Sequence, residues 1–141
     1  MLFEENIYAG TSGIELPVSN KLQYPLEFQE KSRLTYYASL FNTVEINSSF
    51  YKIPMASTVR KWAESVPEGF RFTFKLWKEI THAKELVFNP ADVNRFMETI
   101  AHASVKEGCL LVQFPPSINI LKINQFNQLL TCTQDANLNN R

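Results

Sequence analysis

Three side chains in this sequence have the chemistry of catalytic groups: Glu45, Lys75 and His82. A carboxylate can act as a general base or a metal ligand, and an imidazole can act as an acid, a base or a ligand. An ammonium group can clamp an anion or serve as an amine nucleophile. Each of the three lies in or just after a strand-like segment, and we expect them to share one site.

Five further polar side chains are candidate substrate contacts, namely Thr11, Ser12, Asn47, Tyr51 and Gln113. They lie near the carboxyl ends of strand-like segments. In a βα barrel these ends line the functional mouth, whereas the opposite face serves stability. The eight candidates therefore predict a polar group that converges on one mouth.

Each candidate also has a structural interpretation. Glu45 and Lys75 could form a buried ion pair, because an unpaired buried charge is costly. Asn47 and Gln113 could satisfy neighbouring backbone groups, and His82 could cap a turn. A Schiff base at Lys75 would need a desolvated amine, of which the sequence gives no sign.

The turn Gly10-Thr11-Ser12-Gly13 could offer backbone N–H groups and hydroxyls to a phosphate. It matches neither a Walker loop nor a dinucleotide-binding fingerprint. An anion site at this turn stays an open alternative.

The elements that must position these residues alternate between short strand-like runs and amphipathic stretches, four times along the chain. The predicted strands cover residues 6–10, 43–47, 70–77 and 109–114, and the helices cover 31–41, 57–66, 90–101 and, more weakly, 123–130. This is the pattern of βαβ units in a parallel sheet.

Individual residues predict where the helices begin and end. Asn42 suits a left-handed stop, Ser57 an N-cap, and Gly108 a stop after the third helix. Asn89 and Pro90 form an N-cap and N1 pair.

The alternation of side chains sorts the strand faces. Phe70, Phe72 and Phe74 share one face, which we expect helices to cover. If Val44 and Ile46 pack on helices in the same way, Glu45, Asn47 and Lys75 point into the barrel.

Four βα units leave two sheet edges open, whereas a closed barrel has eight strands and about 250 residues. The chain has 141 residues. It is either a complete small α/β sheet or half of a (β/α)8 barrel. We expect residues 1–130 to form the domain and residues 131–141 to be a disordered polar tail.

Several local sequences resemble the YecE-like family, also catalogued as domain of unknown function seventy-two. They are residues 8–13 (YAGTSG), 36–51 (YYASLFNTVEINSSFY), 67–72 (PEGFRF) with Lys75, 80–82 (ITH) and 110–117 (LLVQFPPS). The resemblance implies a TIM-barrel-like fold and an unassigned activity, and it favours the half-barrel interpretation. Ile14 stands where family members often have an aromatic residue, and the family's carboxy-terminal half is missing.

Composition restricts the function classes. Fourteen basic and fourteen acidic residues cancel, so net charge does not indicate nucleic-acid binding. The chain has no signal-peptide pattern and no apolar run of the length needed to cross a bilayer, so we expect a cytoplasmic protein without a membrane partner. Cys109 and Cys132 have no zinc or redox spacing, and the sequence names no cofactor or metal.

Three functions remain. The first is a hydrolase or lyase that acts on a small polar or phosphorylated substrate at the barrel mouth. The second is a noncatalytic ligand-binding or interaction module. The third is a metal-dependent hydrolase or nuclease that the missing half completes. Open sheet edges also predict self-association.

Overall fold

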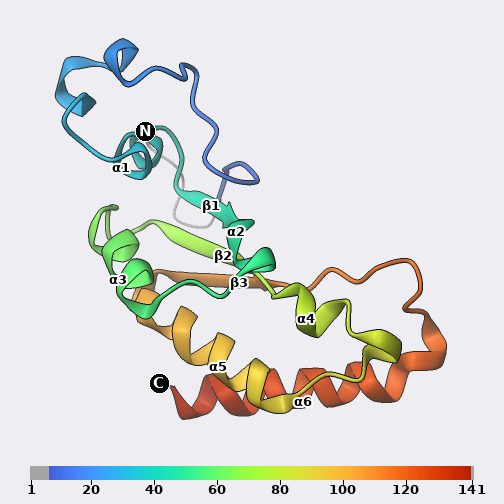
Figure 1. Cartoon of the computed structure of the whole chain (residues 1–141). Helices are drawn as coiled ribbons and strands as arrows, with labels where there is room; N and C mark the ends of the chain where they lie inside the picture. The colour runs from blue at the N-terminus through green and yellow to red at the C-terminus, as the bar shows by residue number, and fades with distance from the viewer. Residues whose placement is uncertain (1–6, 141) are drawn as a thin grey trace.

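The computed structural model describes residues 7–140 and contains one parallel sheet with helices packed against one face (Figure 1). The main elements are α1 (Arg33–Leu40), β1 (Thr43–Ile46), α2 (Ser48–Tyr51), α3 (Ala56–Glu64), β2 (Arg71–Lys75), α4 (Lys78–Thr81), α5 (Pro90–Ile100), β3 (Glu107–Leu111) and α6 (Ile123–Asn139). Short 3₁₀ segments lie at Lys21–Gln23, Leu26–Phe28, Lys84–Leu86, Ala101–Lys106 and Ile120–Lys122. No helix within this part of the chain is long and apolar enough to cross a membrane.

The sheet has the strand order β1-β2-β3, and both pairs are parallel. Ile46 lies beside Phe74, and Phe74 lies beside Leu110. The predicted α/β class with a parallel βα repeat is confirmed. The sheet is open, as in half of a TIM-like barrel. β3 begins and ends earlier than predicted, at Glu107 and Leu111.

The predicted first strand is not formed as a strand in the described residues, and its Asn6 lies outside them. Instead, the turn makes one parallel bridge to β1, with Gly13 N donating to Glu45 O at 2.9 Å and Glu45 N donating to Thr11 O at 3.1 Å. The segment that precedes the turn is held by the Asn42 side chain, which accepts a hydrogen bond from Ala9 N and donates one to the carbonyl oxygen of Ile7. A side chain thus takes the hydrogen bonds that a neighbouring strand would have supplied.

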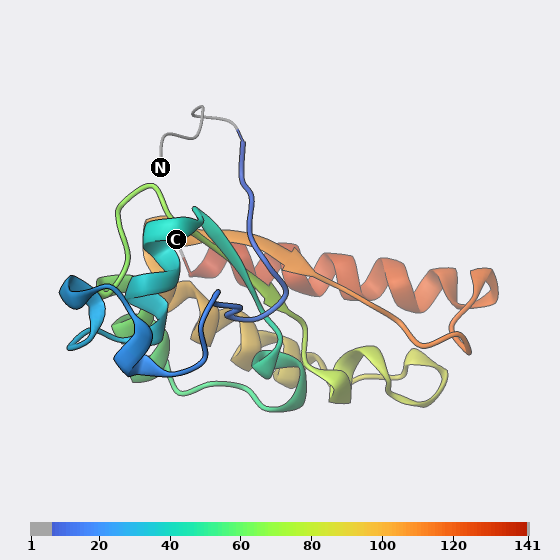
Figure 2. The same ribbon diagram turned by 90° about the horizontal axis from the view of Figure 1, so that it is seen from above.

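The core lies between the sheet and the helices α3, α5 and α6, and α1 adds Leu34 and Tyr37 to it (Figures 1 and 2). Phe70, Phe72, Phe74 and Leu76 are at most 1% exposed, as the alternation in β2 predicted. Burying a side chain of this size stabilises a fold by roughly 1.5–3 kcal/mol. The Phe face therefore anchors the sheet on its helices and leaves the opposite face to polar residues.

Of the four predicted helix ends, one is confirmed and three are wrong. Asn89 caps α5 by accepting from Ala91 N at 3.0 Å, and Pro90 is the first helical residue. Ser57 lies inside α3, because the chain already turns helical after the N-cap Met55. Asn42 does not have a left-handed backbone. Its side chain instead holds the segment that precedes the turn.

Gly108 is not a helix stop but a residue of β3. The chain leaves α5 through the 3₁₀ segment Ala101–Lys106, in which Ser104 has a φ of 56°. A Cβ at Gly108 would lie 2.9 Å from the Phe72 carbonyl oxygen. Glycine is needed here because β3 passes close to β2 where their register shifts.

Residues 131–139, predicted as part of a disordered tail, continue helix α6. Leu129 and Ala136 are buried, and Cys132 packs on the same core. Their spacing of three and four residues forms a helical stripe of small and apolar side chains. The polar composition of this segment belongs to the outer face of the helix.

Candidate site at the carboxyl ends of the strands

The carboxyl ends of β1 and β2 lie side by side because the two strands are parallel, and each leads into a short helix (Figure 1). Val44 and Ile46 are buried on the helical side, whereas Glu45 is half-buried on the other face. The same alternation places Lys75 on the face of Glu45. Asn47 follows β1 and is joined to this face by its hydrogen bond to Ser12. α2 and α4 therefore flank a polar mouth.

Ser12, Glu45 and Asn47 form a hydrogen-bonded group in this mouth. The Ser12 hydroxyl donates to Glu45 Oε1 at 3.0 Å, and Asn47 Nδ2 donates to Ser12 Oγ. The bridge between Ser12 and Glu45 brings the two side chains to the same level of the sheet. The carboxylate is therefore held by a neutral donor. Within the described residues, its second oxygen has no hydrogen bond.

Lys75 and His82 meet at the ring of Phe50. Lys75 Nζ lies 4.6 Å from the centre of this ring, and the His82 ring lies 5.1 Å away at 77°. Tyr51 packs edge to face on Phe50, with ring centres 5.0 Å apart. Lys78 Nζ lies 5.8 Å from the centre of the Tyr51 ring. Two ammonium groups and three rings thus form a second cluster beside the Glu45 group.

Glu45 and Lys75 do not form the ion pair that sequence reasoning allowed. Ion pairs within residues 7–140 include Arg95–Asp92 at 3.6 Å and Lys122–Glu85, and neither involves Glu45 or Lys75. Lys75 faces a ring, and Glu45 accepts from Ser12. The two charges are held apart by different neutral partners.

Thr11 has a structural place in the turn. Its N–H donates to the Tyr37 hydroxyl at 2.7 Å, and its own hydroxyl lies 2.9 Å from the same oxygen and 2.6 Å from Gly13 O. Tyr37 is fully buried and donates to Thr43 O at 3.0 Å. The N–H groups of Thr11 and Gly13 are therefore both engaged, which removes two donors from the proposed anion site at this turn.

The last two predicted residues are arranged differently. The Nδ1 of His82 is 2.8 Å from the hydroxyl of Thr81, which is fully buried, so one ring nitrogen is engaged. Gln113 is exposed beyond the end of β3, and no hydrogen bond joins it to the other candidates in the described part of the chain. The structure brings Gln113 into neither cluster.

Sequence reasoning missed Ser49, Phe50 and Lys78. The Ser49 hydroxyl is buried and lies 2.7 Å from the carbonyl oxygens of both Ile46 and Lys75, so it ties the ends of β1 and β2 together. The strand alternation could not place these residues, because they lie in the short helices beyond the strand ends. Their position directly after a strand was the available signal.

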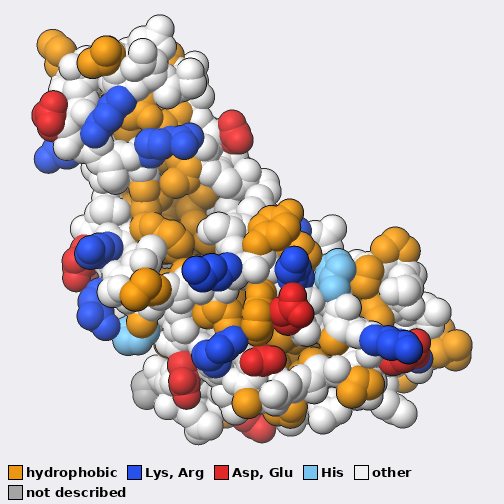
Figure 3. All heavy atoms as spheres, viewed as in Figure 1, with side chains coloured by type: hydrophobic (Ala, Val, Ile, Leu, Met, Phe, Trp, Pro, Cys, Tyr) orange, Lys and Arg blue, Asp and Glu red, His pale blue; other side chains and the backbone are white. Residues whose placement is uncertain are grey.

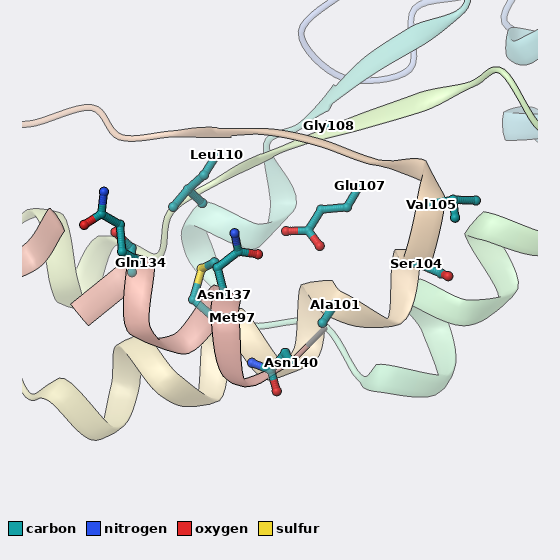
Figure 4. A pocket seen from close by; sticks show the side chains of 11 residues that line it. Met97, Ala101, Ser104, Val105, Glu107, Gly108, Leu110, Gln134, Asn137 and Asn140 are labelled. Carbon is teal, nitrogen blue, oxygen red and sulfur yellow. The ribbon is translucent and has the colours of Figure 1, made fainter. Parts of the chain in front are cut away.

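Two hollows in the described part of the chain lie away from this mouth. A groove of about 670 Å³ runs between the amino-terminal end of β3 and the end of α6, where Glu107, Gly108 and Leu110 face Gln134 and Asn137 (Figure 4). A smaller hollow of about 320 Å³ is lined by residues that include Trp77 and Arg95. Neither contains a predicted site residue. The mouth is an open face because three strands do not enclose it.

Within residues 7–140, no three His, Cys, Asp or Glu side chains lie close enough to hold a metal ion. Glu45 and His82 are the metal-ligand types that the mouth itself contributes. Most protein metal sites use at least three such ligands. Any metal centre here would need further ligands from outside the described residues.

An open parallel α/β sheet with polar residues at the carboxyl ends of its strands is consistent with half of a TIM-like βα barrel. The chain belongs to the family described as Protein of unknown function DUF72, which matches residues 8–138. The resemblance seen in the sequence is thereby confirmed.

The relatives are longer than this chain. UPF0759 protein YunF of Bacillus subtilis is 31% identical over 72% of the chain, which corresponds to 38% of YunF. UPF0759 protein YecE of Escherichia coli K12 is 32% identical over 58% of the chain and 30% of YecE. A crystal structure of a DUF72 family protein from Enterococcus faecalis at 2.52 Å resolution matches 70% of this chain and 43% of its own, with a TM-score of 0.62 and 25% identity. The chain spans less than half of each.

Proposed function

We propose that the mouth at the ends of β1 and β2 binds a small polar, phosphorylated substrate and acts on it as a hydrolase or lyase. The observation that carries this proposal is the separation of Glu45 from Lys75. Glu45 is held by Ser12, while the Lys75 ammonium has no carboxylate partner in the described chain. A base and an anion-binding cation thus face one mouth without neutralising each other.

Each group has a role in this proposal. Lys75 binds the phosphate by charge, with Lys78 beside it. Glu45 takes a proton from a water molecule or from the substrate, and Ser12 and Asn47 fix its orientation. His82 gives a proton to the leaving group through the ring nitrogen that Thr81 does not engage. The chain spans 38% of YunF, and these roles are assigned only to residues that the structure describes.

A noncatalytic ligand-binding module is the second candidate. It is favoured by the open sheet of three strands and by Tyr51, which is 67% exposed. Closure of an active site expels bulk water and strengthens the electrostatic interactions inside it, and the open face of three strands does not supply such closure. The metal-dependent hydrolase or nuclease is a third form of the proposal, with Glu45 and His82 as two of its ligands.

The variant Glu45→Gln separates catalysis from binding. Its amide oxygen can still accept from Ser12, but it cannot take up a proton as a base. We would measure binding by calorimetry and phosphate release or elimination, with ribose 5-phosphate and para-nitrophenyl phosphate as probes. Retained binding with lost turnover supports the enzyme. Binding without turnover in both the wild type and the variant supports the binding module, and no binding of either probe contradicts the proposal.

A further inference from the structure

We infer that the ligand of this mouth carries a planar aromatic ring as well as a phosphate, as a nucleoside monophosphate does. The ring stacks on Tyr51, and the phosphate lies beside Lys75 and Lys78. This inference rests on the proposed function, because it names the ligand class of the same site.

Tyr51 is an exposed ring in a fixed position. It is 67% exposed, although aromatic side chains usually gain stability from burial. Its contact with Phe50 is edge to face at 87°, and both residues belong to α2. The buried Ser49 anchors this helix to the ends of β1 and β2. A ring held in this way can receive a flat ligand without first becoming ordered.

The cations of the cluster are held weakly. Lys75 and Lys78 contact the rings of Phe50 and Tyr51 at 4.6 and 5.8 Å, and neither forms an ion pair among the described residues. A lysine over a ring at an exposed position gains little free energy. A phosphate can therefore draw both ammonium groups away and uncover the face of Tyr51.

The arrangement alternates rings from α2 with cations from β2 and α4. Figure 3 shows hydrophobic, Lys or Arg, and His side chains side by side in the region of these elements. Proteins that bind nucleotides without base specificity stack the bases on aromatic side chains and contact the phosphates with basic side chains. A quaternary ammonium ligand, which also favours rings, would be repelled by the two lysines.

The inference predicts a preference among three probes. Adenosine monophosphate should bind about tenfold more tightly than ribose 5-phosphate, which is the gain expected from one stacked base. Adenosine should bind more weakly than either, because it lacks the phosphate. Calorimetric titration of the chain with each probe measures all three affinities.

Three variants test the position of the ring. Tyr51→Leu should bring the ratio between adenosine monophosphate and ribose 5-phosphate close to one, whereas Tyr51→Phe should preserve it. Tyr8→Leu is a matched control, because Tyr8 is 49% exposed and precedes Ala9, which bonds Asn42 at the other end of β1. That variant should keep both affinities.

The outcomes distinguish the inference from the proposed function. If the wild type binds both phosphates with equal affinity, or if Tyr51→Leu keeps the preference, the ring-stacking inference is overturned and the phosphate site stands. If the wild type binds neither phosphate, the proposed function itself fails. A preference that is lost in Tyr51→Leu and kept in Tyr51→Phe supports both.

Discussion

The Ser12 hydroxyl donates a 3.0 Å hydrogen bond to Glu45 Oε1 although the two residues are 33 positions apart. The bond exists because the turn at residues 10–13 runs beside β1 and forms a bridge there. The Thr11–Tyr37 contact holds the same turn from the core side. One turn thus links the core of the domain to its candidate base.

We expect Ser12→Ala to change ligand chemistry more than stability. The bond is exposed, so its loss should affect the free energy of unfolding very little. The substitution removes the hydrogen bond that orients the Glu45 carboxylate, and it also removes the hydroxyl to which Asn47 donates. Turnover of a phosphorylated probe should fall severalfold. Ser39→Ala is the control, because Ser39 bonds a backbone carbonyl within α1, and a similar fall there would contradict the role of Ser12.

Tyr37→Phe should destabilise the fold by about 1–3 kcal/mol, the cost of leaving buried polar groups without partners. The variant loses the hydroxyl that accepts from Thr11 N and donates to Thr43 O. Tyr36→Phe should be nearly neutral, since the Tyr36 hydroxyl makes no hydrogen bond in the described structure, although the side chain is 6% exposed. Urea unfolding of both variants measures the difference. Equal losses would disprove the structural role of the Tyr37 hydroxyl.

Two glycines should respond oppositely to alanine. Gly108→Ala should cost about 1–3 kcal/mol, because its Cβ would meet the Phe72 carbonyl oxygen at 2.9 Å. A Cβ at Gly69 would have no atom within 4 Å, and the φ of Gly69 lies outside the left-handed region. Gly69→Ala should be neutral or slightly stabilising. Thermal unfolding of the pair tests the contact between β2 and β3, and an unchanged Gly108→Ala protein would refute it.

We propose that the chain self-associates through β3. This strand has no partner on its outer side in the described sheet, and its exposed Gly108 and Cys109 carry no charge. Edge strands are commonly protected from pairing by lysine, and two copies of one edge can pair across a twofold axis. The mass from light scattering should rise with concentration for the wild type and Cys109→Ser, and less for Cys109→Lys. A wild type that stays monomeric throughout would contradict this proposal.

The sequence predicted most of the features that depend on a simple period. Alternation in the strands placed Phe72 and Phe74 on the helices and Glu45 on the polar face, because strand geometry fixes this alternation. It could not predict that Lys75 would face Phe50 rather than Glu45. The contact of Lys75 depends on where α2 places Phe50 after the end of β1. The alternation of side chains along a strand contains no information about the position of that helix.

Polar residues caused the other errors. Asn42 has the short side chain of a helix stop, but it binds the backbone around Ala9, far earlier in the chain. The polar residues beyond 130 suggested disorder, whereas Cys132 and Ala136 continue a core stripe on one face of α6. Composition averages the two faces of a helix, so it hid the buried face.

The most direct test of the central claim is to map a phosphorylated ligand on the chain by NMR. In a titration of the isotopically labelled protein with ribose 5-phosphate, we expect the largest amide shifts around Glu45, Lys75 and His82. Residues that line the groove beside β3, such as Ser104 and Asn137, should stay unchanged. Shifts concentrated at that groove, or no shifts at all, would contradict a phosphate-binding mouth at the ends of β1 and β2.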